Sequence, residues 1–296
     1  MKTAIIGLGL IGGSMAIDLR KAGLATSVLG VDKNPDHAGR AVELGLVDQI
    51  VTLEEAVINA DLIITAIPVN AIKAVLIKVL DHISEKTIVI DTGSTKSMIC
   101  RAIEKHPKRS QFVAAHPLAG TENSGPDAAF SGLFLQKTNI ICEKEKSSEK
   151  ALEAAERIFS ALQMRTIFMD PVEHDKHVAY VSHLSHVSAF LLGQTVLDIE
   201  KDEKNIFNLA GSGFASTVRL AKSSPDMWAP IFEQNAEYLS QALLEYIMHL
   251  QKFQYHLMKR DVNELHRIMT GANHIRKVLE GMDVKQQTNA LIENKT

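Results

Sequence analysis

His116 ends an apolar run and leads directly into a proline and a glycine-rich loop, in the stretch FVAAHPLAGTENSG (112–125). Pro117 fixes the backbone just beyond the histidine and limits the conformations that the histidine itself can adopt. An imidazole, with an unperturbed pKa of about 6.5, can remove a hydroxyl proton while a hydride leaves the same carbon. The alternative is that His116 is a core residue whose ring is hydrogen-bonded to a backbone carbonyl, as is usual for a histidine after a buried strand. The hypothesis of a catalytic base therefore depends on a hydride acceptor beside it.

A glycine-rich turn near the N-terminus predicts a site for such an acceptor. The sequence GLGLIG (7–12) follows the apolar run AII and precedes the helical stretch GSMAIDLRKAG. Gly7 permits a tight turn, Gly9 lets the backbone approach a pyrophosphate, and Gly12 lets the helix pack closely on the strand. The free amides at the start of the helix then bind the phosphate. The pattern therefore predicts a dinucleotide-binding site.

Asp32 follows the second apolar run, 20 residues after the last glycine of the turn. A carboxylate at this place accepts hydrogen bonds from a ribose 2′-hydroxyl and repels a 2′-phosphate, which favours NAD over NADP. Lys33 and Arg40 lie nearby and make this preference moderate. The residues expected to contact NAD are Gly7, Gly9, Leu10, Ile11, Gly12, Asp32, Ile67 and Pro68.

Polar residues follow further apolar runs, at IPVN (67–70), DTGSTK (91–96) and AHPLAGTENSG (115–125). In open parallel sheets ligands bind outside the carboxyl ends of the strands, so these segments are candidates for one site. Ser94 is either the N-cap of a following helix or an active-site hydroxyl, and one hydroxyl can serve as both. Asp91 and Lys96 are interpreted as local structure.

The elements that position these residues change character near residue 170. Before it, short apolar runs alternate with helical stretches, as in a sheet covered by helices on both faces. The predicted strands are 3–7, 27–32, 62–67, 87–92, 111–116, 138–142 and 165–170, and a helix is predicted at 149–163. We expect an α/β fold with a Rossmann-like, mostly parallel sheet over 1–169, followed by an all-α helical domain over 170–296.

The second half reads as two long helices. One spans 171–199, and the other spans 222–261 with Ser224 as cap and Pro225 at its first position, while Pro230 bends its opening turns. A seam of apolar residues at alternating spacings of four and three predicts helix packing and oligomerisation. Its members are Leu239, Leu243, Tyr246, Leu250, Phe253 and Leu257.

Four histidines crowd the first of these helices, His174, His177, His183 and His186. At about 3.6 residues per turn they fall on opposite sides in pairs, so we predict no metal site. The SHLSH pair faces either a ligand or the interior of a helical bundle. Arg219, an isolated cation among apolar residues, predicts binding of a carboxylate substrate or a structural ion pair.

The bulk composition narrows the class of protein. The 296 residues suit two domains, and 46% hydrophobic residues with a formal net charge of -3 predict a soluble globular protein without a nucleic-acid partner. Cys100 and Cys142 are expected to be buried in a reducing, cytoplasmic compartment. No apolar run is long enough to cross a membrane. The polar stretch after the helices, GMDVKQQTNALIENKT, is too short for another domain.

The motifs together resemble the prephenate dehydrogenases of tyrosine biosynthesis along nearly the whole chain. The resemblance is carried by GLGLIGGS (7–14), DTGSTK (91–96), HPLAGTENSG (116–125), SHLSH (182–186) and GSGFASTVRLAKSSPDMW (211–228). It implies an NAD-dependent oxidative decarboxylation of prephenate to 4-hydroxyphenylpyruvate. It also implies a homodimer formed through the helical domain.

The resemblance assigns roles to single residues. His116 accepts the proton of the ring C4 hydroxyl as hydride passes to the nicotinamide, and Ser94 hydrogen-bonds near His116 or that hydroxyl. Arg219 anchors a substrate carboxylate, and His186 faces the pyruvyl side chain. The further substrate-binding residues are Ser182, His183, Thr121, Glu122 and Trp228.

Three other functions compete with this prediction. Arogenate dehydrogenase performs the same chemistry on the amino-acid analogue, but His186 suits a keto acid better than an amine, which prefers an acidic neighbour. A β-hydroxyacid dehydrogenase would need a lysine and an asparagine spaced on the long helix, and we find none. A redox sensor would hold NAD without turnover. Tyrosine feedback is left open by the sequence.

Overall fold

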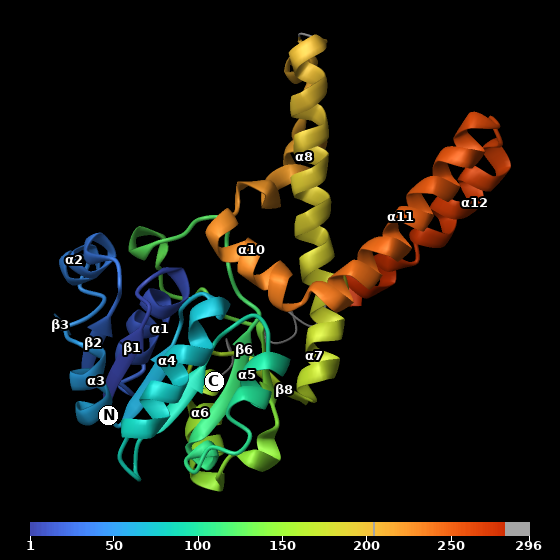
Figure 1. Ribbon diagram of the computed structural model, residues 1–296. Helices are drawn as coiled ribbons and strands as arrows, with labels where there is room; N and C mark the ends of the chain where they lie inside the picture. Colours follow the sequence, from blue (N-terminus) through green and yellow to red (C-terminus); the bar gives the residue numbers. More distant parts are fainter. Residues whose placement is uncertain (204, 282–296) are drawn as a thin grey trace, which may run out of the picture. The chain divides into compact units, whose positions relative to one another are not determined.

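The structure is a computed structural model that describes residues 1–203 and 205–281 (Figure 1). Its internal contacts divide the chain into a large unit, Met1–Leu239, and a smaller unit that begins at Ser240. Every residue predicted above for the active site belongs to the large unit. The polar tail, in which we expect no further domain, lies almost wholly at 282–296, outside the described residues.

Eight strands form one sheet in the order β3-β2-β1-β4-β5-β6-β7-β8. The strands are β1 (Lys2–Ile6), β2 (Ser27–Val31), β3 (Gln49–Ile50), β4 (Leu62–Thr65), β5 (Ile88–Asp91), β6 (Phe112–Pro117), β7 (Thr138–Cys142) and β8 (Arg165–Met169). All pairs are parallel except β6 with β7. The mostly parallel sheet is thus confirmed, and each predicted run forms a strand. The strand order reverses between β1 and β4, where sheets of this kind bind their ligands.

Helices cover both faces of the sheet (Figure 1). They are α1 (Leu10–Lys21), α2 (Pro35–Glu43), α3 (Leu53–Asn59), α4 (Val69–His82), α5 (Ser97–Ala102) and α6 (Glu149–Ala161). Side chains alternate along each strand, so Ile5 packs with α1, α2 and α6 in one apolar cluster, and Ile6 packs with α3, α4 and α5 in another. Cys100 and Cys142 are free and buried in the second cluster, as expected. Burial raises the pKa of the Cys142 thiol to about 12.

Helices continue the chain after β8. They are α7 (Pro171–Val178), a π-helical turn (Ala179–His183), α8 (Leu184–Asp202), α9 (Ser212–Val218) and α10 (Pro225–Gln234). Short 3-10 turns occur at Arg109–Gln111, Pro126–Ala128, Lys144–Lys146, Ile206–Leu209 and Arg219–Lys222. Pro171 and Pro225 each begin a helix, as predicted. The predicted helix over 171–199 is present but contains the π turn.

The prediction of a single helix over 222–261 is wrong, because this segment forms two helices. α10 ends at Gln234, and α11 (Ala236–Met258) begins after Asn235, whose backbone leaves the helical region at φ −108° and ψ 24°. The side-chain amide of Asn235 bonds instead to Asp175 and His183. The break therefore stands where a side chain is drawn into a buried hydrogen-bond network.

The smaller unit holds most of α11 and also α12 (Val262–Ala272). In the predicted apolar seam, Tyr246, Leu250 and Leu257 are exposed by 37%, 52% and 56%. Within the described part of the chain, these side chains have little apolar cover. Among the described residues, no helix is both long enough and apolar enough to cross a membrane.

Candidate active site

The glycine-rich turn joins β1 to α1 and depends on two of its glycines. Gly7 has φ +97°, a conformation that side chains disfavour, and a Cβ there would lie 2.3 Å from the carbonyl oxygen of Ala66. A Cβ on Gly12 would lie 2.0 Å from the carbonyl oxygen of Gly7. The roles predicted for these two glycines, a tight turn and close helix packing, agree with this geometry.

Gly9 differs from its neighbours because open space lies beside it. The nearest atom to a Cβ built on Gly9 is the amide nitrogen of Gly125, 4.0 Å away. Gly9 is the N-cap of α1, no side chain caps this helix, and its first turn contains no acidic residue. The amides of Leu10, Ile11 and Gly12 are therefore available to an anion. The turn fits a dinucleotide pyrophosphate.

Asp32 follows β2 and points at the same turn. Its Oδ2 accepts a hydrogen bond from the Leu8 amide at 2.9 Å, and its Oδ1 accepts one from the Asn34 amide at 2.9 Å. These bonds orient the carboxylate, and each oxygen keeps a lone pair for a ribose hydroxyl. Ile67 and Pro68 follow β4, and Ile67 Cγ2 would lie 2.8 Å from a Cβ on Gly7. The other predicted dinucleotide residues thus belong to or border this turn, and Pro68 follows Ile67 as the N-cap of α4.

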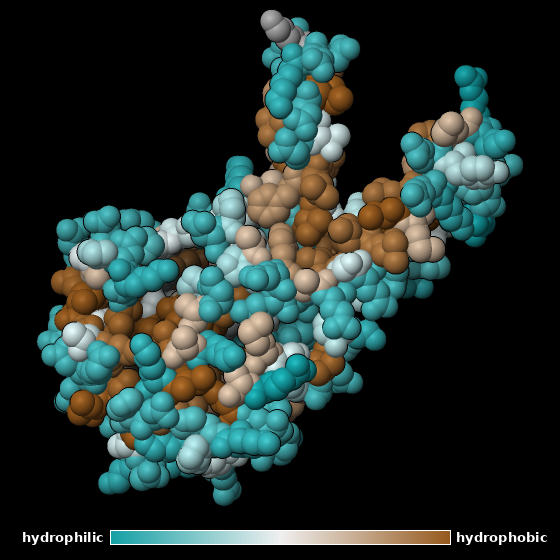
Figure 2. All heavy atoms as spheres, in the orientation of Figure 1, coloured by the Kyte–Doolittle hydropathy of each residue, from teal (hydrophilic) through white to brown (hydrophobic). Residues whose placement is uncertain are grey.

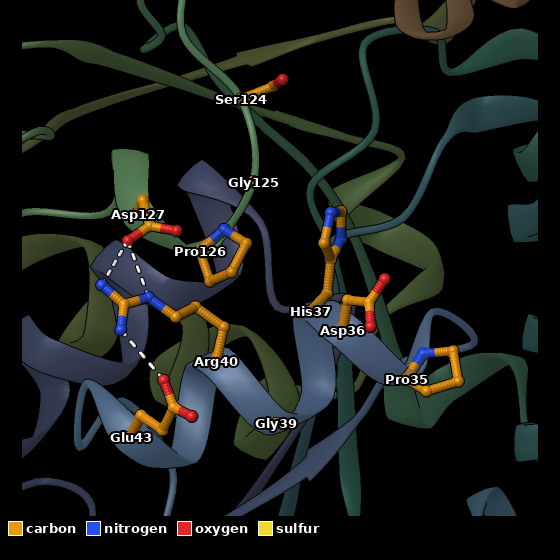
Figure 3. A pocket seen from close by; sticks show the side chains of 10 residues that line it. All are labelled: Pro35, Asp36, His37, Gly39, Arg40, Glu43, Ser124, Gly125, Pro126 and Asp127. Carbon is orange, nitrogen blue, oxygen red and sulfur yellow. Dashed lines mark hydrogen bonds and ion pairs between the residues drawn. The ribbon is translucent and has the colours of Figure 1, made fainter.

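A hollow of about 550 Å³ lies between the start of α2 and the loop after β6 (Figure 3). It is lined by Pro35, Asp36, His37, Gly39, Arg40, Glu43, Ser124, Gly125, Pro126 and Asp127. Gly125 belongs both to this lining and to the surroundings of Gly9. The hollow therefore adjoins the dinucleotide turn on the Asp32 side, where the adenosine half of a dinucleotide would lie.

His116 lies near the carboxyl end of β6, opposite Ile140 of β7, and is 8% exposed. Its Nδ1 is 2.8 Å from Nε2 of His174. Its Nε2 has no hydrogen-bond partner among the described residues. Burial, and next the neighbouring His174 and Lys96, hold the pKa of His116 well below its usual value near 6.5. The imidazole is therefore uncharged at neutral pH and able to accept a proton.

Behind His116, α7 contributes two residues that the sequence analysis did not assign to the site. Nδ1 of His174 is 2.8 Å from Oδ1 of Asp175, and both residues are buried. The sequence contains a signal for them. The inward face of α7 consists of Pro171, His174, Asp175 and Val178, so two polar residues lie on the apolar stripe.

Ser94 lies before α5 but does not cap it, so the capping hypothesis is wrong. The helix begins at Ser97, and the amides of Lys96 and Ser97 donate to the two carboxylate oxygens of Asp175, each at 2.8 Å. A carboxylate from a distant helix thus replaces the local cap. Ser94 forms no hydrogen bond with the described residues, and its hydroxyl is available to a ligand.

Asp91 and Lys96, interpreted as local structure, form a fully buried ion pair. The Lys96 ammonium also donates to the carbonyl oxygen of Ala115 at 2.8 Å. This bond fixes the peptide that precedes His116. Lys96 therefore holds the backbone next to His116, and its charge contributes to the lowered pKa of His116.

The SHLSH motif (182–186) spans the end of the π turn and the start of α8, and its two histidines have different surroundings. Nδ1 of His183 is 3.1 Å from the side-chain nitrogen of Asn235, and burial lowers the pKa of His183 to about 4. The His186 ring stacks on Trp228, with centroids 3.5 Å apart, and its Nδ1 lies 3.0 Å from the carbonyl oxygen of Ser182. The structure thus brings together the four substrate-binding residues predicted in this region, Ser182, His183, His186 and Trp228.

Arg219 and Glu122, both predicted for the substrate, are paired with each other at 3.0 Å. The Arg219 side chain is 51% exposed. The Glu122 backbone amide, and then Arg219, hold the pKa of the Glu122 carboxyl below its usual value, against the opposing effect of burial. Thr121 precedes this pair, and its hydroxyl accepts a hydrogen bond from the Asn123 amide at 3.2 Å. The cation is thus surface-accessible and already faces a carboxylate.

The chain resembles known proteins along nearly its whole length. The family model described as prephenate dehydrogenase, nucleotide-binding domain, matches residues 15–168, and the model described as its dimerization domain matches 170–271. Prephenate dehydrogenase from Bacillus subtilis is 30% identical over 293 residues, which cover 97% of this chain and 78% of the relative.

Solved structures give the same result. Prephenate dehydrogenase from Aquifex aeolicus, solved with hydroxyphenyl propionate and NAD+, superposes with a TM-score of 0.85 at 30% identity, covering 94% of this chain and 98% of the other. Arogenate dehydrogenase from Synechocystis superposes with a TM-score of 0.73 at 29% identity, covering 94% and 100%. The nucleotide-binding sheet and the helical region after it are thus shared features, and the chain belongs to the prephenate dehydrogenase family of oxidoreductases.

Proposed function

We propose that the chain catalyses the NAD-dependent oxidative decarboxylation of prephenate to 4-hydroxyphenylpyruvate, with His116 as the base. One observation carries the proposal. The uncharged His116 keeps Nε2 without a protein partner, at the carboxyl edge of the sheet that also carries the dinucleotide turn. This is the arrangement that proton removal coupled to hydride transfer requires.

The chemistry assigns one task to each group. Nε2 of His116 takes the proton of the ring C4 hydroxyl as the hydride leaves C4, and the nicotinamide ring, when bound, accepts that hydride. Departure of the ring carboxylate as carbon dioxide leaves its bonding electrons in the ring, which becomes aromatic. The proton held by His116 then returns to the phenol oxygen. Because aromatisation favours the products, the protein mainly orients the donor carbon and keeps water out.

The substrate side of the proposal rests on Arg219 and on the His186–Trp228 stack. The planar fork of Arg219 suits a carboxylate, and a substrate carboxylate would compete with Glu122 for it. Trp228 provides a flat apolar surface under His186, whose Nε2 is directed to the substrate side chain in this proposal. Ser94 would hydrogen-bond to the C4 hydroxyl or to His116. Ser182, His183 and Thr121 complete the pocket.

Arogenate is the second candidate substrate, and a specific observation favours it. Glu122 provides a carboxylate next to Arg219, and the ammonium group of arogenate would find there the acidic neighbour that an amine prefers. A relative of known structure is an arogenate dehydrogenase. We favour prephenate because His186 lies in this region, and its ring suits a keto acid side chain better than an ammonium group.

The assembly proposed is a homodimer formed through the helical region. The matching family model for 170–271 is a dimerization domain. Figure 2 shows apolar side chains on the surface of α8, where Leu191, Leu197 and Ile199 are exposed by 55%, 52% and 49%. Apolar surface of this kind marks an interface. The domain boundary at 169/170 stays a prediction, and the two family models meet there.

The test is an NADH absorbance assay with prephenate, arogenate and a panel of hydroxy acids, each with NAD and with NADP. We expect turnover of prephenate with NAD, and a large preference for arogenate would overturn the choice of substrate. His116→Asn should abolish NADH production while NAD affinity, measured by calorimetry, is retained. The absence of turnover in the unaltered protein would favour the redox sensor.

A further inference from the structure

A chain of two hydrogen bonds runs from α7 to the proposed base. Oδ1 of Asp175 lies 2.8 Å from Nδ1 of His174, and Nε2 of His174 lies 2.8 Å from Nδ1 of His116. The Asp175 carboxylate also accepts hydrogen bonds from the amides of Lys96 and Ser97, each at 2.8 Å. These donors, His174 first among them, outweigh burial and keep the pKa of Asp175 below its usual value. Asp175 is therefore ionised and only accepts hydrogen bonds.

The direction of each hydrogen bond follows from that ionised carboxylate. Nδ1 of His174 must carry a proton, because its partner only accepts. Burial, which outweighs the opposing effect of Asp175, lowers the pKa of His174, so the ring is neutral and its Nε2 has a lone pair. Nδ1 of His116 faces that lone pair and must donate. The tautomer of His116 assigned from the network thus has its own lone pair on Nε2.

We propose that His174 and Asp175 are positioning residues that hold His116 in the Nδ1–H tautomer, with Nε2 directed to the substrate hydroxyl. This inference rests on the proposed function of His116 as the base. When Nε2 accepts a proton, His116 becomes an imidazolium, and the bond from His116 Nδ1 to His174 becomes charge-assisted and stronger. Asp175 stabilises the same charge through His174, without itself taking the proton.

The surroundings of His116 make this fixed orientation necessary. The groups that face it are His174 and Asp175 from α7, His183 from the π turn, and the Lys96–Asp91 pair beside α5 and β5. Lys96 and the neighbouring histidines disfavour a positive charge on His116, and Asp175 is the carboxylate joined to it by the hydrogen-bond chain. Without these hydrogen bonds the His116 ring is free to adopt the Nε2–H tautomer, in which Nε2 cannot accept the hydroxyl proton.

The test compares three substitutions in the full chain. In His174→Gln the amide oxygen can accept from His116 and the amide nitrogen can donate to Asp175, so the tautomer is retained. In His174→Phe the acceptor is lost. In Asp175→Asn the amide nitrogen can donate to Nδ1 of His174, which reverses both bonds and places the His116 proton on Nε2. His177→Gln, an exposed histidine of the same helix, is the matched control.

We expect kcat with prephenate to fall at least about 100-fold in His174→Phe and Asp175→Asn, as when a triad carboxylate is lost, with KM changed only severalfold. His174→Gln should stay within about tenfold of the unaltered enzyme, and His177→Gln should match it. Equal losses in His174→Gln and His174→Phe, or losses confined to KM, would overturn the inference. The acid limb of the pH profile should also move in His174→Phe and not in His177→Gln.

A second measurement reads the tautomer itself and needs no turnover. Nitrogen-15 NMR of histidine-labelled protein, with His116 assigned through His116→Asn, distinguishes a protonated ring nitrogen from a bare one. At about pH 7.5, where the ring is neutral, Nδ1 of His116 should be protonated and Nε2 bare. A proton on Nε2 in the unaltered protein contradicts the inference, even if the enzyme turns over prephenate. If the protein has the expected tautomer but does not turn over prephenate, the proposed function is wrong and the hydrogen-bond assignment is still correct.

Discussion

Two nitrogens of the Arg40 guanidinium contact one carboxylate oxygen of Asp127, Nε at 2.8 Å and Nη2 at 2.7 Å (Figure 3). Nη1 of the same group donates to Glu43 at 3.0 Å. The sequence suggested that Arg40 weakens the preference for NAD, because a free arginine near Asp32 can bind a 2′-phosphate. Arg40 is instead occupied by two carboxylates, which leaves the preference to Asp32.

The first prediction concerns this cofactor preference. Asp32→Ser should lower kcat/KM for NAD by about tenfold, because the ribose hydroxyls lose a charged acceptor. Asp127→Asn alone should change NAD use little. In the variant with both Asp32→Ser and Asp127→Asn, Arg40 loses its Asp127 partner and can contact a 2′-phosphate where Asp32 stood. The ratio of kcat/KM for NADP to kcat/KM for NAD should then rise at least about tenfold above the ratio in Asp32→Ser. An unchanged ratio on adding Asp127→Asn would show that Arg40 takes no part in selectivity.

The second prediction separates two glycines of the dinucleotide turn. A Cβ at Gly12 collides with the Gly7 carbonyl oxygen, at 2.0 Å, whereas a Cβ at Gly9 meets only an amide nitrogen 4.0 Å away. Gly12→Ala should therefore lower the thermal unfolding midpoint by several degrees, and Gly9→Ala should leave it nearly unchanged. The affinity for NAD, measured by calorimetry, should fall in Gly9→Ala because the methyl group occupies the space of the pyrophosphate. A Gly9→Ala variant that binds NAD normally would place the phosphate elsewhere.

The sequence was informative wherever the cause of a structure is local. Seven apolar runs became strands. Six of them are buried on both faces along most of their length, whereas β8, at the edge of the sheet, is exposed or half-buried. The glycine turn has its predicted backbone because Gly7 and Gly12 leave no room for a side chain. The two-residue β3 escaped prediction because so short a run has no period. The inversion of β7 also escaped, since strand direction depends on the path of the preceding loop.

The candidate site was predicted less completely, because its support comes from distant parts of the chain. Asp175 caps α5 from a position 78 residues after Ser97, and His174 meets His116 across 58 residues. No local pattern specifies such pairs. The π turn similarly shifts the helical register before His186, so ideal helix angles do not apply to the four histidines together.

The third prediction uses Trp228, the chain's single tryptophan, as a reporter of His186. The two rings stack with their centroids 3.5 Å apart. Burial lowers the pKa of His186, and the charge of Arg219 lowers it further, while the hydrogen bond to the Ser182 carbonyl opposes both effects. A protonated imidazole should quench the indole more strongly than a neutral one, so emission should fall as pH drops through a midpoint below about 6.5. In His186→Gln that step should disappear. A step that persists in the variant would assign the quenching to another group.

The last prediction is acid destabilisation caused by His183. Its pKa is about 4 in the folded protein because of burial, compared with the usual value of 6.5, so the unfolded chain binds a proton more tightly in that pH range. Stability is therefore greatest above pH 6.5 and decreases as pH falls toward 4, and the loss from this residue at pH 5 is about 2 kcal/mol. His116 and His174, whose pKa values are also lowered mainly by burial, add to the effect. Urea unfolding between pH 7 and pH 5, at a fixed protein concentration, should show the decrease. The decrease should be smaller in His183→Gln and unchanged in the exposed control His177→Gln. If the unaltered protein and both variants show the same pH dependence, His183 is not buried in its neutral form.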